Sequence, residues 1–207
     1  MIKNIIFDIG GVIAYFDENE VVSTYSGDKK VQKFLKENVI YSPEWVKCGL
    51  IDLGYISLED MGHIICDRTD HIYDEFIMDL SINHINFIDV RYNVLDLIKR
   101  LKNNGYKVYL LSNTNEKAMA KHNEKHLEDL VDGAVLSYQV HSVKPHLGIY
   151  KELLNKYNLN PSESIFIDDR KANIDTANKL GIIGVKVKPN SYEDVIDSLK
   201  KYNVNVD

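Results

Sequence analysis

The sequence is poor in the features that mark several large classes of protein. Its two cysteines, Cys48 and Cys66, lie far apart without a CxxC spacing, which favours idle thiols in a reducing compartment over a disulfide or redox motif. No apolar run approaches the ~18 residues that a membrane-spanning helix needs. The first residues, MIKNIIFDIGG, contain an acid, two glycines and no small-residue cleavage site, so they do not resemble a signal peptide. We therefore expect a cytoplasmic protein outside the membrane.

Positive charge is also in deficit. The chain has 25 Lys and Arg against 31 Asp and Glu, a net charge of -6, whereas a nucleic-acid-binding protein needs a basic face. The adjacent glycines at positions 10 and 11 do not form a GxGxxG fingerprint, and no P-loop is present. The 207 residues suffice for one domain with a modest insertion, and a monomer is the default expectation.

What the sequence does contain is a series of short apolar runs separated by helical patterns. Continuous apolar runs of this length are typical of strands that are buried on both faces, and they occupy residues 3–7, 106–111, 133–137, 164–168 and 182–187. Segments with helical periodicity lie between the last four, at 116–130, 148–159 and 173–181, the third ending on Gly181. This alternation predicts an α/β fold, a three-layer sandwich around a parallel Rossmann-like sheet.

The stretch between the first and second strands breaks this rhythm. Residues 16–88 contain helix-like pieces and no strong strand, among them a segment that begins with a Ser57–Asp60 capping box and another at 73–81. Pro43 favours a further helix start before residues 44–50. A strong helix at 90–107 then leads into the second strand. We predict a core of residues 1–15 and 89–207 that carries a small helical domain, residues 16–88.

Polar residues follow four of the predicted strands, where an open α/β sheet binds its ligands. Taken one at a time, each is typical of a turn, a helix cap or a solvated surface. Taken together, three carboxylates at one edge would repel each other unless cations compensate them, and a lysine and an oxygen-ligated Mg²⁺ would do so. The residues are Asp8, Ser112, Asn113, Lys144, Asp168 and Asp169.

Four stretches, in this order, make the sequence resemble the haloacid dehalogenase-like hydrolase superfamily, which consists mostly of phosphatases. They are FDIGGV, YLLSNTN, VKPHLGIY and IFIDDRKANIDTANKLG, and the last is the most specific. The resemblance covers essentially the whole chain. A helical insertion after the first motif, acting as a cap over the site, is also typical of this superfamily.

The resemblance implies a role for each motif residue. Asp8 would attack a phosphoryl group and form an aspartyl-phosphate that water hydrolyses. Ser112 and the Asn113 backbone N–H would bind phosphoryl oxygens, and Lys144 would balance their charge. Asn173 would orient the fourth motif. The Mg²⁺ ligands would be Asp8, the Gly10 carbonyl, Asp168 and Asp169. The partner would be a small phosphate ester.

Gly10 departs from the usual pattern. Most phosphatases of the superfamily have a second Asp there as general acid and base, a contribution of ~10²–10⁴-fold. A bacterial subset similar to glucose-1-phosphatase reads FDLGNV at this place and is active, which favours a small phosphorylated metabolite, such as a sugar phosphate, as substrate. Asp17 is one candidate for a substitute proton donor, although it also suits the cap of the helix that follows it.

Four alternatives remain open. A degenerate binding or regulatory protein would explain Gly10 without turnover. A 2-haloacid dehalogenase also lacks the second Asp but has no use for paired acids such as Asp168 and Asp169. A phosphomutase needs the missing acid. A phosphoacceptor signalling domain has its acidic pair first in the chain, whereas here the pair comes last.

Several histidines and aromatic residues have no assigned role. His122 and His126 have an i, i+4 spacing that can hold a metal, but their charged surroundings favour a solvated helix face. His141 and His146 flank Lys144 in a predicted surface loop. Five aromatic residues in the insertion or directly beside it are candidates either for packing it or for lining a substrate pocket: Tyr15, Phe16, Tyr41, Trp45 and Tyr55.

Overall fold

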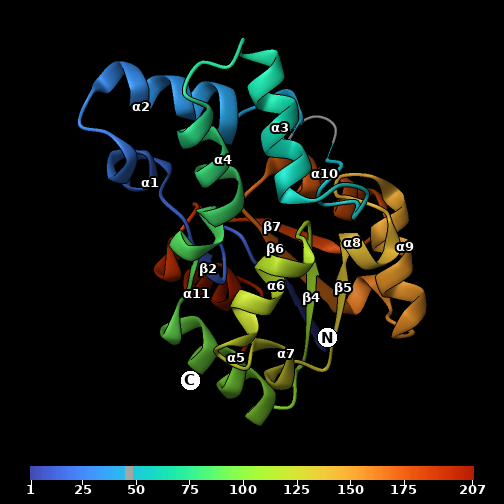
Figure 1. Ribbon diagram of the computed structural model, residues 1–207. Helices are drawn as coiled ribbons and strands as arrows, with labels where there is room; N and C mark the ends of the chain where they lie inside the picture. The colour runs from blue at the N-terminus through green and yellow to red at the C-terminus, as the bar shows by residue number, and fades with distance from the viewer. Residues whose placement is uncertain (45–48) are drawn as a thin grey trace.

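The computed structural model describes residues 1–44 and 49–207, and its centre is a sheet of five parallel strands (Figure 1). Every predicted strand is confirmed to within one residue at either end. In sheet order the strands are β5 (Gly133–Leu136), β4 (Lys107–Ser112), β1 (Asn4–Phe7), β6 (Ser164–Asp168) and β7 (Ile183–Lys186). Within the described ranges, no helix is long and apolar enough to cross a membrane.

Helices cover both faces of the sheet, because successive side chains of a strand point to opposite sides. In β1, Ile5 and Phe7 pack into one cluster with α5 (Tyr92–Asn103) and α11 (Tyr192–Lys201). Ile6 points the other way, into a second cluster with α9 (Leu147–Lys156) and α10 (Lys171–Lys179). The predicted three-layer α/β sandwich is confirmed.

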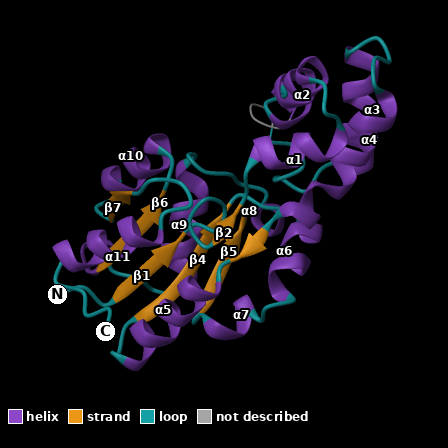
Figure 2. Cartoon of the chain, turned by 90° about the vertical axis from the view of Figure 1, so that its left-hand side faces the viewer, coloured by secondary structure: helices purple, strands orange, loops and turns teal. Residues whose placement is uncertain are grey.

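Residues 16–88, which we call the helical insert, stand beyond the ends of the strands (Figure 2). The insert has an apolar cluster of its own, with Leu35, Met61 and Leu80 fully buried in it. Its helices are α1 (Glu18–Tyr25), α2 (Lys29–Leu35), η1 (Lys36–Ile40), α3 (Leu58–Arg68), α4 (Asp74–Asn83) and η3 (His84–Phe87). The expected division into two domains stays a prediction, and this separate cluster supports it.

Two short strands that the sequence did not reveal join the insert to the core. β2 (Ala14–Tyr15) pairs antiparallel with β3 (Asp89–Val90), so the chain leaves and re-enters the core side by side. Strands of two residues are too short to produce a periodic pattern. The pairing brings the two ends of the insert together at one place.

The helix predicted over 116–130 is wrong as a single element. It is two helices, α6 (Glu116–Asn123) and α7 (Leu127–Leu130), and His126 between them has a left-handed backbone with φ of 57°. Shorter elements complete the core: α8 (Ser137–Val140) and η4 (Pro161–Glu163).

The residues that the sequence predicted at two helix ends are confirmed. The Ser57–Asp60 capping box is confirmed in both directions at the start of α3. Gly181 has a positive φ of 82° just after α10, as a helix-ending glycine should. Cys66 is a buried free thiol. Trp45, Cys48 and most of the helix expected after Pro43 lie outside the described residues.

Candidate active site

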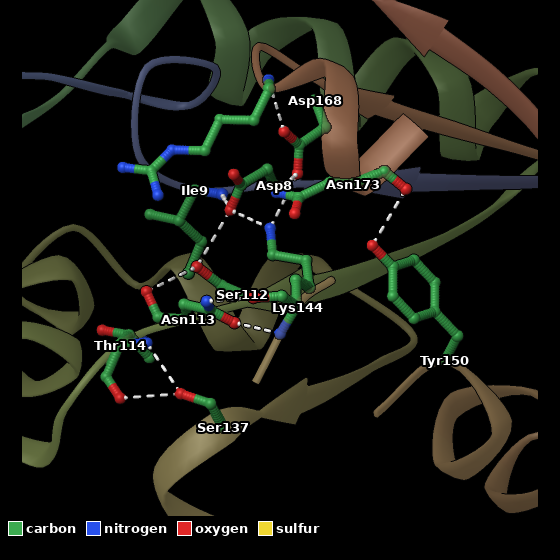
Figure 3. Close-up of polar contacts among 11 residues, drawn as sticks. Asp8, Ile9, Ser112, Asn113, Thr114, Ser137, Lys144, Tyr150, Asp168 and Asn173 are labelled. Atoms are coloured by element: carbon green, nitrogen blue, oxygen red, sulfur yellow. Dashed lines mark hydrogen bonds and ion pairs between the residues drawn. The ribbon is translucent and has the colours of Figure 1, made fainter. Parts of the chain in front are cut away.

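The sheet order brings the predicted site residues together. β1 lies between β4 and β6, and Phe7 is in register with both Leu110 and Ile167. Asp8, Ser112 and Asp168 therefore stand next to one another at the carboxyl edge of the sheet, and the loop before α9 places Lys144 among them (Figure 3). Residues far apart in sequence thus form one buried polar cluster.

Lys144 is the centre of this cluster. Its Nζ lies 2.8 Å from Asp8 Oδ1 and 2.8 Å from Asp168 Oδ2, and its side chain is only 1% exposed. Burial alone would lower the pKa of this amine, but the charges of Asp8 and Asp168 outweigh it and raise the pKa. Lys144 therefore stays a cation held between two acids.

One carboxylate oxygen of Asp8 makes all of the hydrogen bonds found between this side chain and the described residues. Its Oδ1 accepts hydrogen bonds from the Ile9 backbone N–H at 2.7 Å and from Ser112 Oγ at 3.0 Å, in addition to Lys144. No hydrogen bond to Oδ2 is found among residues 1–44 and 49–207, so that oxygen is left for a ligand. Burial raises the pKa of Asp8 to about 7, against the pull of Lys144.

Asp168 is fully engaged by its neighbours. Its Oδ1 accepts from the Arg170 backbone N–H at 2.7 Å, and its Oδ2 accepts from Asn173 Nδ2 at 2.9 Å as well as from Lys144. Burial opposes its charge, but Lys144 and these hydrogen bonds prevail and lower its pKa. Asp168 is therefore a charged residue that holds Lys144 and the loop after β6 in place.

Asp169 differs from Asp168 in having a more open carboxylate. It is half-buried, and no side chain of the described residues donates a hydrogen bond to it. Burial and the charge of Asp168 raise its pKa. Carboxylate oxygens of Asp8, Asp168 and Asp169 all lie within 4.8 Å of one another. Hard oxygen ligands at this spacing suit a divalent cation such as Mg²⁺, whose charge would relieve the repulsion.

The Asn113 side chain has a position that the motif did not reveal. Its Nδ2 donates to the Lys144 carbonyl at 3.0 Å, and its Oδ1 accepts from the Lys144 backbone N–H at 2.7 Å. The amide thus fixes the backbone of the loop that positions the Lys144 amine. The sequence analysis gave a role only to the backbone N–H of Asn113. The role of its side chain was not predictable, because no local pattern shows which distant loop a side chain contacts.

Two further contacts support the same loops and were also missed. Ser137 Oγ accepts from the Thr114 backbone N–H at 3.0 Å and donates to the Thr114 carbonyl at 3.1 Å. Tyr150 Oη donates to the Asn173 carbonyl at 3.0 Å (Figure 3). Ser137 therefore ties the end of β5 to the segment after β4, and Tyr150 ties α9 to α10.

The two glycines after Asp8 have different reasons to be there. Gly11 has a φ of +72°, and a Cβ at this position would lie 3.0 Å from Asp169 Oδ2, so a side chain there would be strained and would press on Asp169. Gly10 has no positive φ, and a Cβ would meet nothing within 4 Å. The backbone does not require glycine at position 10, where the usual acid is missing.

Asp17 is engaged elsewhere. Its Oδ1 accepts from the backbone N–H groups of Asn19 at 2.8 Å and Glu20 at 3.3 Å, which caps α1 and lowers its pKa. A carboxylate held ionised in a helix cap is a poor proton donor, so the capping interpretation of Asp17 is confirmed.

The histidines and aromatic residues divide in ways that the sequence did not predict. His122 is buried, which corrects the expectation of a solvated face, whereas His126 is exposed. Phe16 packs against the cluster of the insert, but Tyr41 and Tyr55 are 53% and 61% exposed. The ring of Tyr55 stacks on His141 of the core.

A family model for haloacid dehalogenase-like hydrolases matches residues 2–181, which include every residue of this cluster. The chain belongs to the haloacid dehalogenase-like hydrolase family. The family match extends through the helical insert and through four of the five strands of the sheet, all but β7.

Two curated relatives are phosphatases. A D-ribitol-5-phosphate phosphatase of Bacteroides thetaiotaomicron is 30% identical over 194 residues, 87% of this chain and 89% of the relative. A sesquiterpene phosphatase of Aspergillus oryzae is 27% identical over 186 residues, 88% of each chain.

Solved structures agree with the family assignment. A haloacid dehalogenase family enzyme of Bacteroides thetaiotaomicron superposes with a TM-score of 0.73 at 25% identity, over 95% of this chain and 98% of that one. The same enzyme has been solved in complex with magnesium and inorganic phosphate, with a TM-score of 0.69. An L-2-haloacid dehalogenase of Xanthobacter autotrophicus, at 15% identity and a TM-score of 0.67, shares the fold.

Proposed function

We propose that this protein is a Mg²⁺-dependent phosphatase that hydrolyses a small phosphate ester through an aspartyl-phosphate on Asp8. The observation that supports this best is the environment of Asp8. Three donors fix its Oδ1, and Oδ2 has no donor among the described residues, so the carboxylate is both oriented and available. The phosphatase relatives favour a phosphoric monoester as substrate.

The proposed ligands of Mg²⁺ are the carboxylates of Asp8 and Asp169, the Gly10 carbonyl, and Asp168 in support. The three acids lie within 4.8 Å of each other and offer the oxygen donors that this ion prefers. What the ion supplies when bound is positive charge against the phosphoryl oxygens. The magnesium and phosphate complex of the Bacteroides thetaiotaomicron enzyme supports this assignment.

Residues of the chain itself carry out the bond-making steps and bind the phosphoryl group. A carboxylate oxygen of Asp8 bonds to phosphorus as the ester oxygen departs, and water then attacks the same phosphorus and releases Asp8 and inorganic phosphate. Ser112 and the Asn113 N–H bind phosphoryl oxygens, and Lys144 balances their charge. Asn173 keeps Asp168 oriented through its 2.9 Å hydrogen bond. Such a site acts mainly by positioning and electrostatics.

We propose the helical insert, residues 16–88, as a cap that selects the substrate. It stands beyond the carboxyl ends of the strands, where a substrate would enter (Figure 2). Tyr41 is largely exposed, which leaves its ring available for contact with a substrate. A sugar or polyol phosphate is the finer proposal, supported by the ribitol phosphate relative and by the likeness of FDIGGV to the glucose-1-phosphatase-like subset.

The test is hydrolysis of p-nitrophenyl phosphate and a panel of sugar and polyol phosphates, with Mg²⁺ and with EDTA. We expect metal-dependent release of phosphate that Asp8→Asn abolishes and the exposed control Asp129→Asn leaves unchanged. Binding of Mg²⁺ without hydrolysis of any ester would favour the degenerate binding protein. Release of halide from a 2-haloacid without Mg²⁺ would favour a dehalogenase.

A further inference from the structure

A phosphatase with glycine at position 10 needs another group to protonate the departing oxygen. Within the described ranges, the acids of the core that lie at the site are Asp8, Asp168 and Asp169, and all three have other assignments. Asp17 caps α1. Another acid near the site lies in the helical insert, in the loop that precedes α3.

Residues 49–55 form a tight loop in front of α3. Its backbone is closed by hydrogen bonds from Leu53 N to Gly49 O at 2.7 Å and from Tyr55 N to Leu50 O at 2.9 Å. Gly49 and Gly54 have φ of 58° and 75°, which permits the sharp turns. We call this segment the cap loop.

The cap loop lies directly against the core segment that precedes Lys144. His141 Nδ1 lies 2.7 Å from the Leu53 carbonyl, and its ring is parallel to that of Tyr55, with centroids 5.3 Å apart. A Cβ on Gly54 would lie 3.0 Å from the Tyr138 carbonyl, so the two backbones approach closely. On its other side the loop is anchored by Ile51, buried in the cluster of the insert. The loop is thus fixed to both parts of the molecule.

Asp52 lies between these anchors, in the loop whose Gly49 would place a Cβ 3.8 Å from Val143, the residue before Lys144. Its carboxyl is half-buried and feels the positive charges of Arg170 and of Lys144, whose Nζ is 2.8 Å from Asp8. No side chain of residues 1–44 or 49–207 donates a hydrogen bond to it, which distinguishes it from Asp17. Burial raises the pKa of Asp52 to about 6, although Arg170 and then Lys144 pull it down. A carboxyl whose pKa lies this close to neutral pH can both release and take up a proton during turnover.

We propose that Asp52 is the general acid and base of this enzyme, in place of the side chain missing at Gly10. The inference rests on the proposed phosphatase function. As the bond from phosphorus to the ester oxygen breaks, the Asp52 carboxyl gives its proton to that oxygen, and an alcohol leaves. The Asp52 carboxylate then takes a proton from the water that attacks phosphorus, the bond to Asp8 breaks, and Asp52 is protonated again.

The test compares two leaving groups in the Asp52→Asn variant. Ribitol 5-phosphate releases an alkoxide that needs the proton, and we expect kcat/KM to fall by ~10²–10⁴-fold. p-Nitrophenyl phosphate releases a stable anion, so its kcat/KM should change by less than about tenfold. A burst of one p-nitrophenolate per enzyme should precede a slow steady state, because the base for the second step is missing.

Two companion variants make the result specific. Asp67→Asn, on an exposed face of α3 with its side chain 78% exposed, should match the parent on both substrates. Gly10→Asp in the Asp52→Asn background places an acid where a side chain meets nothing within 4 Å, and it should restore hydrolysis of ribitol 5-phosphate.

The outcomes separate this inference from the proposed function. If the unaltered protein hydrolyses neither ester, the proposed function fails. If it hydrolyses both and Asp52→Asn slows both equally, without a burst, Asp52 acts only structurally and the inference is overturned. A rise in KM for ribitol 5-phosphate alone, with kcat unchanged, would make Asp52 a substrate-binding residue and would equally overturn it.

Discussion

The carboxyl edge of the sheet and the helical insert bury opposite kinds of side chain. The edge buries charge: Lys144 and Asp168 are 1% and 0% exposed, and Lys144 lies within hydrogen-bonding distance of both Asp8 and Asp168. The insert buries an apolar cluster and leaves its ion pairs, such as Lys33–Glu37, near the surface. A buried charged cluster tolerates little change, whereas an apolar cluster specifies a shape and leaves its surface free to vary.

Removing the charge of Asp8 should give the largest effect on activity and the smallest on stability. Asp8→Asn keeps the shape and leaves Lys144 paired with Asp168, so we expect a loss in kcat of at least ~10⁴-fold. Because burial already disfavours the Asp8 carboxylate, the melting temperature should not fall. Steady-state kinetics and thermal unfolding of one preparation check both statements. A well-folded variant with substantial activity would exclude Asp8 as the nucleophile.

Removing the cation should damage stability as well as turnover. Lys144→Met has a similar volume but leaves Asp8 and Asp168 buried without their partner, an expected cost of about 3–5 kcal/mol in the free energy of unfolding. The matched control is Lys171→Met, which breaks an exposed pair with Asp175 and should cost at most ~1 kcal/mol. Equal costs in urea unfolding would contradict the view that burial makes the difference.

A cavity in the insert should cost as much stability without touching the edge. Leu35 is fully buried, so Leu35→Ala should lower the free energy of unfolding by about 2–5 kcal/mol. The Mg²⁺ affinity of the folded protein, measured by calorimetry, should stay the same because no metal ligand lies in the insert. Leu147→Ala, at a leucine that is 45% exposed, is the control. A large loss of Mg²⁺ binding would show that the two regions are coupled.

Acid should destabilise the core through His122. Burial without a charged partner lowers the pKa of this imidazole from 6.5 to about 4, so the unfolded chain binds its proton first. Above pH 6.5 the imidazole is neutral in both the folded and the unfolded chain, and the free energy of unfolding is at its full value. As the pH falls towards 4, protonation of His122 in the unfolded chain lowers the free energy of unfolding by up to ~3 kcal/mol. In His122→Leu the slope of unfolding free energy against pH should flatten over this window. The exposed His126→Gln variant should keep the slope of the parent protein.

The smallest expected effect concerns the contact between the two regions. His141→Ala removes the 2.7 Å contact with Leu53 O and the stacking on Tyr55, so the cap loop should be held less firmly. One hydrogen bond contributes ~0.5–1.5 kcal/mol, which corresponds to a loss in kcat/KM of about tenfold or less. His146→Ala, an exposed neighbour in the same loop, provides the comparison. An unchanged His141→Ala enzyme would show that the cap loop is positioned by other contacts.

The strands and the edge residues were predictable because their signals are local. An apolar run that ends in Asp8 or in Asp168–Asp169 predicts both a strand and the polar group at its end. Parallel strands then bring these ends to one edge of the sheet. Helix caps such as Ser57–Asp60 were predictable for the same reason. The two-residue strands β2 and β3 were not, because their pairing joins segments far apart in the chain, and the break at His126 was not, because no glycine or proline marks it.

The sequence by itself determined the sheet, the family motifs and the absence of an acid at Gly10. Only the tertiary structure decided that glycine is favoured at Gly11 and merely allowed at Gly10, since the reasons are the positive φ of Gly11 and the approach of Asp169 from the loop after β6. Only the tertiary structure brought the loop of Asp52 against the segment that precedes Lys144, because contacts between the cap loop and His141 join residues nearly ninety positions apart, and no local pattern records such a contact.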